Sequence, residues 1–135
     1  MLDSFVAGSA LLLTSWLFGG MLLFSVGFAA FVFQVLPVTE ARLLIRKAFP
    51  PFYLFVLGAS FVSALLCLAI DHTSAIVLGL IALTTVFARQ VLMPAINAAT
   101  DRGDKRRFAL LHTFSVLLSL AHIAASAAVL IRLAK

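Results

Sequence analysis

The chain has little charge and few polar side chains. Charged residues make up 11% of its 135 residues and hydrophobic residues 64%, whereas soluble domains have about 25% charged and about 45 to 50% apolar residues. So few polar side chains cannot cover the outside of a chain of this length in water, so most of its surface must face lipid. The composition therefore excludes a soluble globular protein and predicts an integral membrane protein.

The sequence also lacks the groups on which most enzymes depend. Its single cysteine, Cys67, lies in an apolar run, which excludes an intrachain disulfide and a thiol cluster for a metal. No Asp or Glu falls well inside an apolar run, and no glycine-rich phosphate motif is present. No basic region precedes the first apolar run, so we expect that run to be retained rather than cleaved as a signal peptide.

Four apolar segments are long enough to cross a bilayer, which takes about 20 residues in a helix. Because the segments show no polar alternation and must satisfy their backbone groups internally, we expect helices. The short connections predict antiparallel neighbours, and so an all-α, up-and-down four-helix bundle forming one domain over residues 1–135. The apolar and basic stretch between Pro37 and Pro50 predicts a short interfacial helix after the first span. The four expected spans are Phe5–Leu36, Phe52–Ile70, Ser74–Ala99 and Phe108–Ile131.

All but one of the basic residues lie in the gaps between the apolar runs or near the C-terminus, so the net charge of +5 indicates membrane topology and not nucleic-acid binding. Seven of them fall in the first and third connections, and two lie near the C-terminus. The excess of positive charge places those two connections in the cytoplasm and both termini outside. The seven are Arg42, Arg46, Lys47, Arg102, Lys105, Arg106 and Arg107, and the two are Arg132 and Lys135.

The fourth span carries a polar stripe of His112, Ser115, Ser119, His122 and Ser126. The intervals of three and four residues keep these side chains within an arc of about 80° on a helix. One interpretation is packing, with serines allowing close approach and histidines bonding to a neighbouring helix. The other is a site for a metal, a porphyrin, a proton or a polar solute. The two histidines are about 15 Å apart along the helix, so a shared ligand would need groups from another helix or another chain.

The third span contains Arg89, Pro94 and Asn97. Arg89 could extend toward the cytoplasmic headgroups, or it could meet an acceptor inside the bundle. Pro94 is expected to bend the helix and to free a carbonyl, either for packing or as part of a binding site. The acceptors considered for Arg89 are Gln34, Glu40 and Asp101.

Small residues recur at helical spacing in the first two spans and predict faces where helices meet. The contacts could form within one chain, between copies in a homo-oligomer, or with other subunits of a membrane assembly. These residues are Ser15, Gly19, Gly20 and Gly27 in the first span, where Gln34 continues the spacing of Gly20 and Gly27, and Ala59, Ser63 and Cys67 in the second.

Several segments together resemble the small bacterial membrane proteins related to transmembrane protein 205. The segments are GGMLLFSVGFAAFVFQVLP, the stretch from Ala41 to Tyr53, MPAIN, and RFALLHTFSVLLSL. In that family a Pro and an Asn close the third helix, and an Arg-Phe pair precedes a His that is followed three residues later by Ser. Those positions here are Pro94, Asn97, Arg107, Phe108, His112 and Ser115. The chain departs from the family near Ala30, where a proline is common, and at Ser119, where an Asn is common.

The resemblance implies a bacterial inner-membrane protein whose relatives are mostly uncharacterised, with a eukaryotic relative linked to resistance against platinum drugs. A more distant similarity to small four-helix proteins of copper and haem metabolism implies a cofactor role for the histidines, although fold alone does not transfer an activity. Two hypotheses follow. The chain is a non-enzymatic membrane protein with a polar interior, acting in transport, resistance or as a subunit. Alternatively, it binds haem, a porphyrin or copper through His112 or His122.

Overall fold

The computed structural model covers residues 1–135 and consists of four long antiparallel helices, each long and apolar enough to cross a membrane. The expected all-α, four-span bundle is confirmed. The first helix is α1 (Leu2–Leu22), η1 (Leu23–Phe28) and α2 (Ala29–Val35), and the second is α3 (Val38–Cys67). The third is α4 (His72–Phe87), η2 (Ala88–Leu92) and α5 (Met93–Asp101), and the fourth is α6 (Lys105–Leu133). The chain is thus built as a multi-pass membrane protein.

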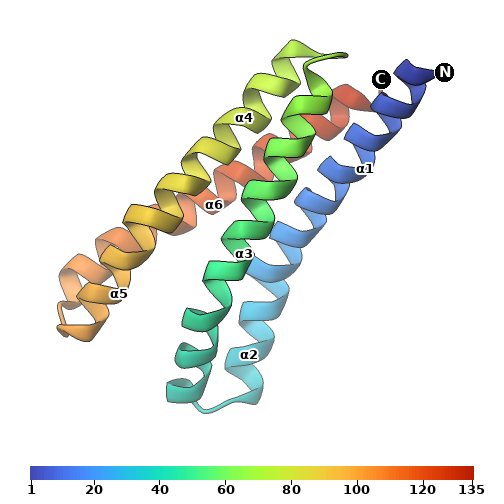
Figure 1. Ribbon diagram of the computed structural model, residues 1–135. Coiled ribbons are helices and arrows are strands. Elements are labelled where there is room, and N and C mark those ends of the chain that lie inside the picture. The colour runs from blue at the N-terminus through green and yellow to red at the C-terminus, as the bar shows by residue number, and fades with distance from the viewer.

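The helices form a ring in which α1 and α4 each pack against both α3 and α6. Both termini and the α3–α4 turn lie at one end of the bundle, which we call the terminal end (Figure 1). The α2–α3 and α5–α6 connections form the other end, which we call the basic end. Toward the basic end, α5 and the start of α6 diverge from α2 and the start of α3 (Figure 1).

The prediction of a separate interfacial helix after the first span is wrong. That stretch forms the first turns of α3, and the helix continues through Pro50 and Pro51. Two consecutive prolines leave the carbonyls of Arg46 and Lys47 without intrahelical donors. Both residues are exposed near the basic end, where water or lipid headgroups can bond to those carbonyls. The missing bonds therefore cost little, and the helix is not interrupted.

Two spans contain a wider helical turn of the π type. In the first span η1 includes Ser25, and in the third span η2 ends two residues before Pro94. Pro94 has no N–H to donate and its ring clashes with the carbonyl four residues earlier. An i→i+5 turn just before it provides room for the ring. The disturbance expected from Pro94 therefore takes the form of a π turn.

Small residues bring the helices together, but only some of the predicted ones do so within this chain. Ala59, Ser63 and Cys67 are all buried, as expected for a contact face. In the first span, a Cβ on Gly20 would lie 2.6 Å from the ring of Phe55, so that glycine permits a close approach of α1 and α3. The other predicted residues of the first span, Ser15, Gly19, Gly27 and Gln34, remain exposed.

Two Arg–Asp ion pairs link different helices at the two ends of the bundle. At the terminal end, Arg132 donates to both carboxylate oxygens of Asp71, each at 3.0 Å. At the basic end, Arg46 donates to both carboxylate oxygens of Asp101, at 2.7 and 2.9 Å. About 32 Å of helix separates Arg46 from Cys67 at the end of α3, close to the thickness of a bilayer's hydrocarbon core, about 30 Å. The two pairs therefore have the spacing of the two membrane surfaces.

The ion pair at the terminal end predicts a pH-dependent contribution to stability. Hydrogen bonds from Arg132 and Ser74 hold the pKa of the Asp71 carboxyl well below its ordinary value. A lowered folded-state pKa stabilises the fold above the unfolded pKa of about 4, and this stabilisation is lost progressively as pH falls below it. We expect Asp71→Asn to lower the melting temperature in detergent at pH 7, and the difference from the unsubstituted protein to shrink below about pH 4. Asp3→Asn, which removes an exposed carboxylate, is the control; an equal effect in both variants would contradict this role.

Candidate functional site

The polar centre of the bundle is a hydrogen bond between the third and fourth spans. His122 Nε2 lies 2.7 Å from Thr84 Oγ1, and the imidazole is 8% exposed. The Thr84 hydroxyl also lies 2.7 Å from the carbonyl of Leu80. A hydroxyl has one proton to donate, so both contacts are satisfied when His122 Nε2–H donates to Thr84 and Thr84 donates to Leu80. In this arrangement Nδ1 of His122 has no partner within the protein.

A small cavity of about 10 Å³ lies beside the imidazole, roughly the space for one water molecule. Polar side chains from three spans line it: Ser25 from η1, Tyr53 from α3, and Ser119 with His122 from α6. The remaining walls are apolar, formed by Met21, Phe52 and Val56. The cavity therefore offers several hydrogen-bonding groups to a very small guest inside an otherwise apolar bundle.

An aromatic cluster holds the Tyr53 wall of the cavity in place. Phe24 of η1 stacks on Phe52, with ring centroids 3.9 Å apart and an angle of 8° between the ring planes. Phe49 packs against Tyr53 with centroids 5.5 Å apart, and the Tyr53 hydroxyl lies close to Ser115. Because such contacts fix ring orientation, Tyr53 presents its polar end to the fourth span.

The polar stripe of the fourth span faces the interior over only part of its length. His122 and Ser126 are buried, Ser115 and Ser119 are half-buried, and His112 is exposed. The His112 ring stacks on Phe108, with ring centroids 5.2 Å apart and an angle of 9° between the ring planes. The stripe leaves the interior because the first turns of α6 diverge from α2 and α3 (Figure 1). The structure thus separates the two histidines into different environments.

The third-span candidates lie nearer the basic end. Arg89 is half-buried in η2, and its Nε is enclosed by protein without a hydrogen-bond partner. Asp101, one expected acceptor for Arg89, is instead bonded to Arg46. The other two, Gln34 and Glu40, are exposed, and neither bonds to Arg89. Asn97 is half-buried, and its side chain makes no hydrogen bond.

The residues do not fit a haem or copper centre. No three His, Cys, Asp or Glu side chains come together in a geometry that could hold a metal ion. At His122, Nε2 is bonded to Thr84 and the adjoining cavity is about 10 Å³, far too small for a porphyrin. His112 is exposed and covered on one face by Phe108. The histidines therefore supply single ligands at most.

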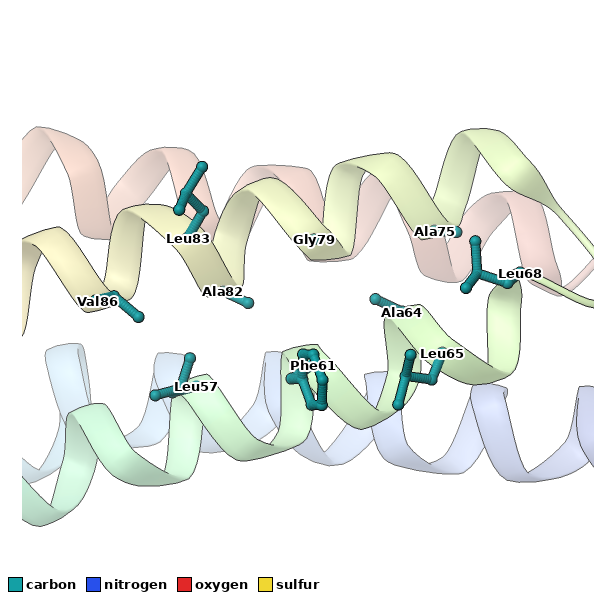
Figure 2. A pocket seen from close by; sticks show the side chains of 10 residues that line it. All are labelled: Leu57, Phe61, Ala64, Leu65, Leu68, Ala75, Gly79, Ala82, Leu83 and Val86. Carbon is teal, nitrogen blue, oxygen red and sulfur yellow. The ribbon is translucent and has the colours of Figure 1, made fainter.

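A larger groove of about 500 Å³ runs between α3 and α4 on the outside of the bundle. Figure 2 shows residues from both helices along it, including Leu57, Phe61 and Leu65 from α3, and Gly79, Leu83 and Val86 from α4. Nine of its ten lining residues are hydrophobic. The groove offers no polar group to a solute, and its chemistry matches the acyl chains of surrounding lipid.

Sequence reasoning missed three residues of the centre: Thr84, Tyr53 and Ser25. Thr84 lies on a different helix from the stripe, and only the packing of α4 on α6 brings it to His122. Tyr53 is the sole tyrosine of the chain, and its hydroxyl within an apolar segment is a signal that could have been used. Ser25 reaches the cavity from a π turn, which no local pattern in the sequence predicts.

These features define a multi-pass membrane protein with a polar centre inside its bundle. Residues 12–105 match the family model of a domain of unknown function, DUF4149, and the chain belongs to that family. No curated protein and no solved structure matches it.

The small cavity makes position 119 sensitive to side-chain volume. Ser119→Leu would replace one oxygen by three carbon atoms beside a space of about 10 Å³, and overpacking of this kind destabilises by roughly 1 to 3 kcal/mol. We expect a lower melting temperature in detergent. Ala124→Leu, an enlargement at an exposed position of the same helix, is the matched control and should leave the melting temperature level or raise it. A Ser119→Leu protein as stable as this control would remove Ser119 from the interior.

Proposed function

We propose that the chain is a non-enzymatic transport protein of the bacterial inner membrane, in which His122 exchanges a proton or a hydrogen bond with a small polar solute. The observation that carries this proposal is the buried imidazole, which is bonded to Thr84 through Nε2 and lines a small cavity. Eleven residues separate His122 from the end of α6 at Leu133, about 17 Å along the helix. The polar centre therefore lies well inside the hydrocarbon depth.

The chemistry of imidazole suits this role. It is the side chain whose charge changes near neutral pH, and ionisable groups at membrane depth typically mark proton or solute pathways. The cavity admits a guest the size of water, which favours a proton carried through ordered water or a very small solute. Larger organic molecules would require the helices to separate.

Polar groups continue from the cavity toward the basic end. Ser119 and Ser115 follow His122 at intervals of one helical turn and are half-buried. At the same end the α5–α6 hairpin diverges from α2 and α3 (Figure 1). The line of half-buried serines supports access to the centre from the basic end, which the positive-inside rule predicts to be cytoplasmic.

The wider setting of the protein is part of the same proposal. The resemblance to proteins related to transmembrane protein 205 supports a role in resistance, which transport of a toxic solute would provide. The exposed small residues of the first span, such as Gly19 and Gly27, support assembly into a homo-oligomer or a larger membrane complex.

A flux measurement tests the role of His122. The purified protein is reconstituted into liposomes that contain a pH-sensitive dye, in phosphate and chloride buffer, and a pH gradient is imposed. We expect dissipation faster than in empty liposomes, and a loss of at least about tenfold in His122→Asn, which removes the imidazole as a proton acceptor and donor. His72→Asn, an exposed histidine at the start of α4, is the matched control. Equal fluxes in the protein and in His122→Asn would contradict the proposal.

Reporter fusions test the orientation. Alkaline phosphatase, which is active outside the cytoplasm, should be active when fused after Lys135 and inactive when fused after Gly103. A fluorescent protein that folds only in the cytoplasm should give the opposite pattern, because the positive residues remain inside. A C-terminus found in the cytoplasm would reverse the proposed direction of access.

A further inference from the structure

Arg89 is a charged side chain deep within a span that has no partner in the protein. Twelve residues separate it from Asp101 at the end of α5, about 18 Å along the helix axis. Its Nε is enclosed by protein and unbonded. The arginine side-chain hydrogen bonds of the protein belong to Arg46 and Arg132, so the two terminal nitrogens of Arg89 are also unpaired. An unpaired guanidinium at this depth is costly, and such residues typically mark a ligand or ion pathway.

Helical spacing shows which way Arg89 faces. Ala75, Ala82 and Arg89 follow one another at intervals of seven residues, and residues seven apart lie within about 20° on a helix. Ala75 and Ala82 line the side of α4 that faces α3 (Figure 2). Only the last two steps to Arg89 lie in the wider turn of η2, so Arg89 lies close to the same side of the third span. Beyond it, α5 packs mainly on α6 while α3 diverges (Figure 1).

Positive charge is concentrated at the end of the bundle from which Arg89 would be reached. Seven basic and three acidic residues occupy that end, and one of the basic residues, Arg46, is paired with Asp101. A surface with an excess of one sign raises the local concentration of ions of the opposite sign. The remaining basic residues there are Arg42, Lys47, Arg102, Lys105, Arg106 and Arg107.

We propose that Arg89 binds a phosphoryl oxyanion that reaches it from the basic end of the bundle. The planar guanidinium presents a fork of N–H donors that matches two oxygens of such a group, and this fork is unoccupied by the protein. The anion is either a soluble phosphate-type solute or the phosphate of an anionic lipid headgroup. This inference rests on the proposed transport function in one respect only. If the anion bound by Arg89 is the transported solute, that solute is negatively charged.

Thermal stability in a non-ionic detergent tests the site. The protein is titrated with inorganic phosphate at constant ionic strength and, separately, with phosphatidylglycerol. We expect a saturable rise in melting temperature, and at least about a tenfold increase in the half-maximal concentration for Arg89→Gln, as befits a lost charge-assisted bidentate contact. Arg106→Gln removes the same charge from an exposed position at the basic end and should leave the half-maximal concentration within about twofold.

The two titrations distinguish the two possible sources of the anion. Stabilisation by phosphate that depends on Arg89 assigns the site to a soluble anion, and stabilisation by phosphatidylglycerol alone assigns it to a headgroup. If Arg89→Gln does not fold, Arg89→Lys takes its place, because it keeps the charge and loses the fork, and it must weaken the response of the melting temperature. The proposal is overturned if neither anion stabilises the protein, or if the response is the same in the Arg89 variant. It is also overturned if the only effect of the Arg89 substitution is to convert a dimer into a monomer. In that case Arg89 contacts a second copy of the chain and not an anion.

This binding measurement is independent of flux. A protein that binds anions through Arg89 but carries no protons through His122 would refute the transport proposal and leave the anion site standing. A protein with flux that depends on His122 and no anion response would do the reverse.

Discussion

The structure depends on one constraint, that a backbone in hydrocarbon must satisfy its own hydrogen bonds. Of 118 backbone hydrogen bonds, 104 lie within helices, and the chain keeps each span helical even where local residues oppose it. At Pro94 the helix widens into a π turn, and at Pro50 and Pro51 it continues with unpaired carbonyls near the basic end. In water such sites would commonly end a helix; in a bilayer, ending it would expose several unpaired groups at once.

Because lipid is as apolar as the helix surfaces, the hydrophobic effect does little to hold the spans together. Small buried residues and a few polar contacts must determine how they pack. The polar contacts occur at three levels: Asp71 with Arg132 at one end, His122 with Thr84 inside, and Arg46 with Asp101 at the other end. Each joins residues far apart in sequence, so together they fix how the second, third and fourth spans pair. The least constrained region is the basic end, where α5 and α3 are linked by the ion pair while their helices diverge.

The sequence predicts the spans well and the site only in part, for separate physical reasons. Hydropathy reports the solvent around a helix, so the four spans follow from composition. Periodicity identifies the stripe of the fourth span, and it groups His122 with Ser126, both of which are buried in the structure. It cannot show that His112 is exposed, because that depends on the divergence of two hairpins. Periodicity also cannot identify Thr84 as the partner of His122, or Arg46 as the partner of Asp101. Both contacts depend on which helices pack together.

The anion proposed for Arg89 and the proton proposed for His122 would offset each other electrostatically. The spans contain no acidic residue at the depth of Arg89 or His122, so nothing in this chain balances a positive charge there. Moving an unpaired guanidinium further from water therefore costs free energy. A guanidinium paired with an anion is nearly neutral, so its desolvation costs much less free energy. A proton on His122 would similarly offset a second negative charge on the bound group. Occupied and protonated together, the interior approaches neutrality, and this is the state in which the helices could move past one another at least cost.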